Sequence, residues 1–219
     1  ARMITICDPG TITGGLLVRQ NYTEADIGQT KAAALAKRLR AIRDDLSVIV
    51  AEGNVPDRTV SLSADLIIDA TVSLSITTYL DGLAGEDHTA LIAQVATDAR
   101  TGSLGIANIC APGVNLTPSE IDDQAGRSVL ADGKLELYHR FWEEVTEGDE
   151  LVPTRGCSVP TFHGSAADLA AVAATLVNII GLHLQQADAP ISGTYLIALP
   201  HVPTGPRYHF LPAAQDTSG

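Results

Sequence analysis

Short aliphatic runs alternate with amphipathic segments in the first part of the chain. Runs of this kind, bounded by turn residues, are typical of buried strands. They cover residues 3–7, 47–51 and 66–68. Between the first two runs, residues 29–43 predict a helix whose inner face carries Leu35, Leu39 and Ile42 at helical spacing. With a second helix expected near 74–83, the order of elements indicates a doubly wound parallel sheet.

The second part of the chain has a different pattern. Two apolar runs flank the turn residues 98–102, which predicts a hairpin. The stretch 116–147 predicts two helical pieces that break near Asp132. Residues 166–184 predict a long helix, apolar on most faces and therefore buried in the domain or in a dimer. The strands expected in this part cover residues 89–96, 103–109, 193–199 and 208–211.

These patterns together predict the α/β fold class, with a Rossmann-like, doubly wound, mostly parallel sheet and an antiparallel extension. Hydrophobic residues make up 45% of the chain but aromatic residues only 4%. The core must therefore be built from Ala, Val, Ile and Leu, as is common where parallel strands are buried on both faces.

Charge and cysteine content narrow the classes of partner. The net charge of −12 repels the phosphates of nucleic acids and of an anionic membrane surface, so neither is an expected partner. The three cysteines are widely spaced and predict neither a disulfide framework nor a cysteine zinc site. They indicate reduced thiols and hence a cytoplasmic location. We see no signal peptide and no apolar run near the ~18 residues of a membrane-spanning helix.

The first candidate binding residue along the chain is Asp8, which follows the first predicted strand. Ligands of open α/β sheets bind outside the carboxyl ends of the strands, where a carboxylate can accept hydrogen bonds from a ribose. The alternative for Asp8 is a turn residue before Pro-Gly. Arg19 and Lys31 add two cations of the kind that a triphosphate needs, so the pattern favours ATP over a nicotinamide cofactor. For Lys31, a single charge on a basic helix is an equally good interpretation.

The segment Ile4–Ile42 resembles the ThiF/MoeB/HesA family, the bacterial relatives of ubiquitin-activating enzymes. An aliphatic strand ends in an aspartate, a Leu-x-Arg-Gln stretch follows, and Ile-Gly-x-x-Lys opens a helix. The matching residues are Asp8, Leu17, Arg19, Gln20, Ile27, Gly28 and Lys31. The strand that leads to Asp69 and Thr71 is similar to the next landmark of the family.

The resemblance implies an enzyme that binds ATP and magnesium. It would adenylate the C-terminal carboxylate of a ubiquitin-like or sulfur-carrier protein and release pyrophosphate. Asp8 would hold the ribose, Arg19 and Lys31 the phosphates, and Gln20 belongs to the same cofactor-binding stretch. Arg19 and Lys31 would also be catalytic, because they stabilise charge that builds on the α-phosphate. Many members of the family are dimers, so a homodimer is expected.

The resemblance also implies one domain over residues 1–219, with a nucleotide-binding core in 1–85 and the hairpin, helices and C-terminal strands in 86–219. The family's first strand and its glycine-rich phosphate loop would precede Met3, and we expect this chain to be part of a longer protein. In this fold the first strand lies beside the strand at Met3. We therefore expect a partner chain or the strand at 194–199 to fill the gap.

Two further differences from the family pattern concern residues at the expected nucleotide and magnesium site. The family's magnesium aspartate directly follows the Thr of the Asp-x-Thr landmark, but that position here is Val72, and an apolar side chain cannot ligate magnesium. The family has an Asn three residues before the arginine that corresponds to Arg19, and that position here is Leu16. Val72 favours an alternative to the enzyme, a non-catalytic ThiF-like dimerisation or binding module.

Cys157 is the candidate for a thioester-forming nucleophile, because it lies in a loop shortly before the long helix. The alternative, a small buried residue in a tight loop, is favoured, since Cys157 is too far from the first turn of that helix for its dipole to act. Cys7 and Cys110 are expected in the core.

Overall fold

The computed structural model describes residues 1–17, 20–51, 53, 55, 58–71, 73–85, 88–143, 164–185 and 191–214. Two compact units divide the chain, Ala1–Ser61 and Leu62–Gly219, and each is described by itself. One domain over residues 1–219, with a nucleotide-binding core in 1–85 and the remaining elements in 86–219, stays a prediction. Cys157, the candidate nucleophile, lies outside the described residues.

The first unit is a β-α-β arrangement. Its strands β1 (Met3–Ile6) and β2 (Ser47–Val50) pair in parallel, with Met3 opposite Ser47. Helix α1 (Lys31–Ile42) connects them, and two short 3-10 turns, η1 (Gly14–Leu16) and η2 (Glu24–Asp26), precede it. Thr30 caps α1 by accepting a hydrogen bond from the Ala33 N–H at 3.3 Å. The short helix α2 (Arg58–Leu62) spans the boundary between the units.

The expected inner face of α1 is wrong at two of its three positions, and the third, Leu39, is half-buried. Leu35 is 40% exposed and Ile42 is 75% exposed, whereas Ala32, Ala34 and Ala36 are at most 1% exposed. Ala32 and Ala36 share one side of the helix and Ala34 lies nearly opposite, because successive residues turn by about 100°. Neighbours therefore approach α1 closely on two sides, where only small side chains fit. Leu35 and Ile42, which dominate the apolar pattern of the sequence, lie outside these contacts.

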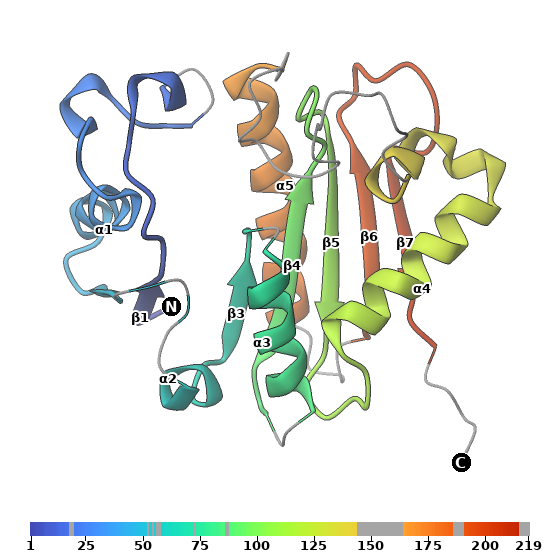
Figure 1. The fold of residues 1–219 in the computed structure, drawn as a ribbon, viewed down its shortest axis with the longest axis horizontal. Coiled ribbons are helices and arrows are strands. Elements are labelled where there is room, and N and C mark those ends of the chain that lie inside the picture. Colours follow the sequence, from blue (N-terminus) through green and yellow to red (C-terminus); the bar gives the residue numbers. More distant parts are fainter. Residues whose placement is uncertain are drawn as a thin grey trace. The chain divides into compact units, whose positions relative to one another are not determined.

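The second unit is built on a five-stranded sheet in the order β3-β4-β5-β6-β7 (Figure 1). The strands are β3 (Leu66–Asp69), β4 (Leu91–Thr97), β5 (Leu104–Cys110), β6 (Gly193–Ala198) and β7 (Tyr208–Pro212). Its helices are α3 (Leu74–Ala84), α4 (Pro118–Ala131), the 3-10 helix η3 (Gly133–Phe141) and α5 (Ala166–Gln185). β3 and β4 are parallel, and the remaining pairs are antiparallel. The α/β class, with parallel strands and an antiparallel extension, is confirmed.

The position of β6 corrects one expectation. The strand at 194–199 was expected as a possible filler beside β1, but β6 pairs with β5 on one side and β7 on the other. A strand with both edges hydrogen-bonded has no edge left for another partner. Within the described residues β1 pairs with β2, and a partner chain beside β1 stays a prediction.

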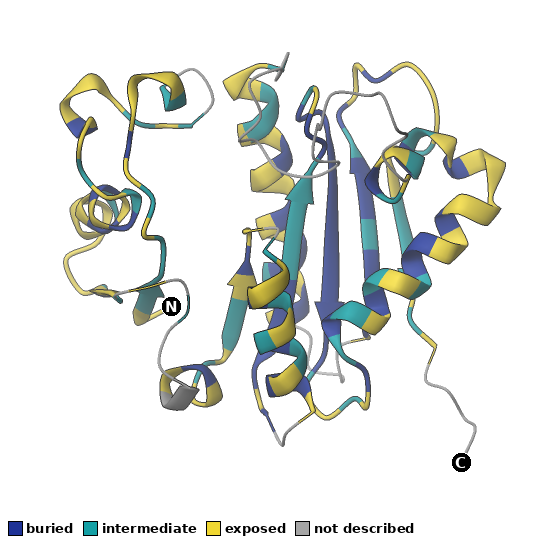
Figure 2. Ribbon diagram, viewed as in Figure 1, coloured by how far each residue is buried: buried dark blue, intermediate teal, exposed yellow. Residues whose placement is uncertain are grey.

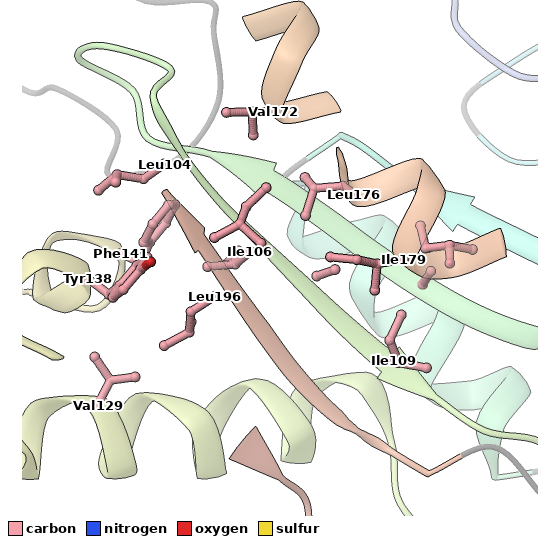
Figure 3. Close-up of a cluster of buried hydrophobic side chains, with 14 of the residues drawn as sticks. Leu104, Ile106, Ile109, Val129, Tyr138, Phe141, Val172, Leu176, Ile179 and Leu196 are labelled. Carbon is pink, nitrogen blue, oxygen red and sulfur yellow. The ribbon is translucent and has the colours of Figure 1, made fainter. Parts of the chain in front are cut away.

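The core of the second unit lies on both faces of its sheet. Val172, Leu176 and Ile179 of α5 point toward the sheet from one side, while Val129 of α4 and Tyr138 of η3 approach from the other (Figure 3). All seven residues of β5 are buried, so this strand is the centre of the unit (Figure 2). The aliphatic, sparsely aromatic core agrees with the composition.

Helix α5 corrects the expectation that no apolar run approaches the length of a membrane-spanning helix. It is long and apolar enough to cross a membrane by length and composition, and it is the one such helix among the described residues. A third of its most apolar window is buried inside the unit, including Val172, Leu176 and Ile180. A single helix of this kind is weak evidence for a membrane span, because helices packed in a protein core meet the same criteria. The absence of a membrane partner stays a prediction.

The predicted hairpin between β4 and β5 is confirmed, and Asp98 organises its turn. Asp98 is fully buried, and its carboxylate accepts hydrogen bonds from the N–H groups of Thr101 at 2.8 Å and Leu104 at 3.1 Å. The Thr101 hydroxyl and the Arg100 N–H also donate to it. The Arg140 guanidinium lies 3.7 Å away. A buried carboxylate with this many donors fixes the turn.

Cys110 at the end of β5 is buried, and its thiol donates to the Leu116 carbonyl at 3.2 Å. Burial, with smaller contributions from the charges of Asp81 and Glu120, raises its pKa to about 11. We expect iodoacetamide to modify Cys110 about a hundredfold more slowly than a free thiol at neutral pH, since only the thiolate reacts. Peptide mapping by mass spectrometry would measure this rate. Equal rates in the folded and urea-unfolded chain would contradict it.

Candidate functional site

The site starts where β1 ends and α1 begins. Asp8 follows β1, and its carboxylate oxygen Oδ1 accepts a hydrogen bond from the Gly10 N–H at 2.8 Å. The Gly10 carbonyl in turn accepts from the Lys31 N–H at 2.8 Å. Residues distant in sequence are thus joined through one glycine, which brings the strand end and the start of the helix together.

Gly10 also shows how close the two charged side chains lie. A Cβ atom added to Gly10 would lie 2.8 Å from Asp8 Oδ1 and 3.3 Å from Lys31 Cε. Both side chains therefore converge over this residue, and a larger residue would displace them. The structure brings Asp8 and Lys31, two of the predicted site residues, together beside Gly10. Their binding and catalytic roles stay predictions.

The long connection between Asp8 and Lys31 is folded back on itself. Thr11 and Thr30 form an isolated antiparallel bridge. Ile12, 1% exposed, donates its N–H to the Gln29 carbonyl at 2.9 Å and accepts from the Gly28 N–H at 3.0 Å. Gly28 has a φ of 86°, a conformation that glycine adopts without strain. The ends of the connection are therefore anchored, and the position of Lys31 relative to Asp8 is defined.

Lys31 is the first residue of α1, where the peptide N–H groups point out of the helix. A helix N-terminus carries a partial positive charge, and the first turn of α1 holds no acidic residue that would neutralise it. Lys31 is half-buried, with its charge added to that of the helix end. An anion such as a phosphate would be attracted to both.

The other two candidate residues are Arg19 and Gln20, and the structure says less about their roles. Arg19 lies outside the described residues. Gln20 is half-buried, donates its N–H to the Leu16 carbonyl at 2.8 Å and accepts from the Tyr22 N–H at 2.8 Å. The backbone of Gln20 is thus part of the connection between Asp8 and Lys31. Its role as a cofactor-binding side chain stays a prediction.

Three residues of the same unit were missed by sequence reasoning. Asp26 is 8% exposed and forms an ion pair with Arg38 of α1 at 2.6 Å. The Arg38 guanidinium carbon lies 5.2 Å from the centroid of the Tyr22 ring. Arg38 is two helical turns beyond Lys31, so both could have been placed on one side of the predicted helix. That spacing is the signal that the sequence offered.

Asp69 is the last residue of the parallel strand β3 and the first residue of the Asp-x-Thr landmark. It is 6% exposed, and its carboxylate accepts from the Thr71 N–H at 2.9 Å, the Thr71 hydroxyl at 2.7 Å and the Gln94 amide at 3.0 Å. Val72 lies outside the described residues. Over the described ranges no group of three His, Cys, Asp or Glu side chains could hold a metal. The donor set at Asp69 does not fit magnesium, which prefers several accessible oxygens.

The residues present fit a nucleotide better than a metal. A carboxylate that can accept from ribose hydroxyls and a lysine at a helix N-terminus that can hold phosphates lie around one glycine. Both groups belong to a single unit of the structure, so their arrangement does not depend on how the two units are placed.

Comparisons with known proteins agree with this fold. The chain is similar to E. coli MccB solved with AMPCPP and MccA, with a TM-score of 0.59 and 14% identity over 98% of this chain and 57% of that one. It is similar to PaaA, with a TM-score of 0.59 and 17% identity over 96% of this chain and 64% of that one. E. coli MccB solved with ATP gives a TM-score of 0.55 and 16% identity, over 96% and 56%. The chain therefore spans less than two thirds of the length of these proteins, and the likeness concerns the fold.

No curated protein sequence matches the chain. The model of the ThiF family matches residues 1–113, which include the whole first unit with Asp8 and Lys31 and continue through β5. This match covers more than half of the 219 residues and contains the strand, connection and helix that form the site. The chain belongs to the ThiF family.

Proposed function

We propose that the chain is the nucleotide-binding part of an adenylyltransferase that activates the C-terminal carboxylate of a peptide or small carrier protein. The observation that carries the proposal is the convergence of Asp8 and Lys31 over Gly10 at the N-terminus of α1. Membership of the ThiF family and a fold shared with an enzyme solved with ATP support it.

Each residue has a defined task in this reaction. Asp8 accepts hydrogen bonds from the ribose, while Lys31 and the N-terminus of α1 hold phosphate oxygens. A carboxylate oxygen of the substrate attacks the α-phosphorus, the bond from that phosphorus to the bridging oxygen breaks, and pyrophosphate leaves. Lys31, joined by Arg19, stabilises the negative charge that builds during the attack. The chain supplies positions and charge, and no covalent step on the protein is required.

The finer parts of the proposal concern partners. We propose a ubiquitin-like or sulfur-carrier protein as the substrate, a homodimer as the assembly and the cytoplasm as the location. ATP is expected to arrive with magnesium. The described residues offer no ligand set for that ion, so no step is assigned to it.

A second candidate function is a binding or dimerisation module that does not turn over ATP. The observation that favours it is the pair Asp69 and Val72. The Asp69 carboxylate is already engaged by Thr71 and Gln94, and Val72 cannot replace it as a ligand. Such a module would keep the nucleotide site and lack the reaction.

Calorimetry and pyrophosphate exchange test the two functions together. Titration of the 219-residue chain with ATP, with and without magnesium, measures binding. Exchange of labelled pyrophosphate into ATP in the presence of a ubiquitin-like protein measures adenylation. Binding with exchange supports the adenylyltransferase, and binding without exchange supports the module. A chain that does not bind ATP contradicts the proposed nucleotide site.

A further inference from the structure

We propose that Arg38 is a positioning residue of the nucleotide site, because it fixes the connection between β1 and α1 to the helix that carries Lys31. The residues that it holds are Tyr22 and Asp26, which follow Gln20 in this connection. The inference rests on the proposed function, because it concerns the same site. It adds to that function a residue that neither the sequence motif nor the fold comparison assigned.

The first point that Arg38 holds is Asp26. The Oδ2 atom of Asp26 accepts hydrogen bonds from the Thr23 N–H at 2.8 Å, from the Thr23 hydroxyl at 2.8 Å and from Arg38 Nη2 at 2.6 Å. The bond from the Thr23 N–H is part of the capping box of η2. The Asp26 side chain is 11% exposed, so water has little access to this ion pair. One carboxylate oxygen therefore ties the turn η2 to α1.

The second point is Tyr22. The Arg38 guanidinium carbon lies 5.2 Å from the centroid of the Tyr22 ring, within the range of a cation–π contact. The Tyr22 N–H donates to the Gln20 carbonyl at 2.8 Å, and the Gln20 N–H donates to the Leu16 carbonyl at 2.8 Å. One side chain of α1 thus contacts the connection on both sides of Thr23. Through Tyr22 this hold extends to Gln20, which belongs to the predicted cofactor-binding stretch.

The end of the connection is joined to the start of α1 by backbone hydrogen bonds. The Asp26 carbonyl accepts from the Gln29 N–H at 3.0 Å, and the Gln29 carbonyl accepts from the Ile12 N–H at 2.9 Å. Arg38 therefore acts on the middle of a segment whose ends are already anchored, and it lies seven residues beyond Lys31 on the same helix. A loop that is ordered before its ligand arrives loses less entropy on binding, which raises affinity.

Two substitutions of opposite charge separate positioning from simple attraction of an anionic nucleotide. Arg38→Ala removes a positive charge and Asp26→Ala a negative one. If Arg38 acts by position, each should weaken ATP binding about tenfold in calorimetry. The double variant should then bind no more weakly than Asp26→Ala alone, because both changes break one ion pair. Tighter ATP binding by Asp26→Ala would show that charge alone matters and would overturn the inference.

Further variants control for folding and for charge. Arg38→Lys keeps the charge and should restore part of the affinity. Lys37→Ala removes an exposed charge of the same helix and should change the dissociation constant by less than a factor of two or three. Circular dichroism checks that each variant is folded. Arg38→Gln, which keeps a long side chain without the charge, carries the same test where Arg38→Ala does not fold.

The second readout is the ratio of the dissociation constants for AMP and ATP. AMP lacks the β- and γ-phosphates, so a connection held in place for the phosphates should matter less to it. Arg38→Ala should lower this ratio several-fold, since ATP binding is weakened more than AMP binding. A merely structural role would weaken both nucleotides equally, and an unchanged ratio overturns the inference while the proposed function stands. A lack of ATP binding by the unsubstituted chain overturns both.

Discussion

Lys31→Ala is expected to weaken ATP binding by the 219-residue chain about 10- to 100-fold. The substitution removes a charge-assisted contact to a phosphate, which contributes about 1.5–3 kcal/mol, and each 1.4 kcal/mol is tenfold in affinity. The fold should persist, because Lys31 opens α1 and alanine is the best helix former. Its backbone hydrogen bond to Gly10 does not depend on the side chain. Calorimetric titration with ATP measures the effect.

The matched control is Lys37→Ala, which removes the same charge from an exposed position of the same helix. It should change the dissociation constant for ATP by less than a factor of two or three, since exposed charges interact weakly through water. If both variants lose affinity equally, general attraction to a basic helix explains binding, and the alternative interpretation of Lys31 as one charge among several is correct. If neither loses affinity, the phosphate site is elsewhere.

Asp98→Ala is expected to lower the free energy of unfolding by about 3 kcal/mol. The carboxylate is fully buried, and its removal leaves the Leu104 N–H without its partner at the start of the central strand. An unsatisfied buried donor costs about 1–3 kcal/mol, and the lost hydrogen bonds of Thr101 add to this. Urea unfolding followed by circular dichroism measures the change.

The control for this prediction is Asp123→Ala, an exposed acidic residue of α4. Its effect should stay within about 0.5 kcal/mol, as is usual at surface positions. A loss of less than about 1 kcal/mol in Asp98→Ala would mean that water replaces the carboxylate in the turn. The hairpin would then be held by its backbone hydrogen bonds alone.

The sequence predicted the strands well, because each is a short aliphatic run bounded by turns. β1, β2 and β3 were found within one or two residues of their observed ends. The hairpin turn at Asp98 was also recognisable from the sequence, because the turn residues 98–102 end in a glycine. In the structure Gly102 has a φ of 65°, a conformation that glycine adopts without strain. Local signals of this kind do not depend on the rest of the fold.

Packing and long-range proximity were harder to predict. Leu35 and Ile42 gave the apolar stripe of α1, yet the alanines are buried, because the sequence does not say how closely a neighbour approaches. The partners of β6 were misjudged for a similar reason, since strand pairing joins residues that are far apart in the chain. Asp8 and Lys31 follow from a motif, whereas the contacts of Arg38 with Asp26 and Tyr22 appear only when α1 is placed against the connection that precedes it.

The place of β6 between β5 and β7 has a consequence for synthesis of the chain. The hydrogen bond from the Thr194 hydroxyl to Asn108 joins residues 86 positions apart, so β5 leaves the ribosome long before its neighbour. At about 5–20 residues per second, the delay is roughly 4–17 s. During that interval an apolar strand has one unpaired edge, the arrangement most prone to pairing with another chain. A nascent chain stalled before residue 193 should therefore recruit chaperones more strongly than one stalled after β7.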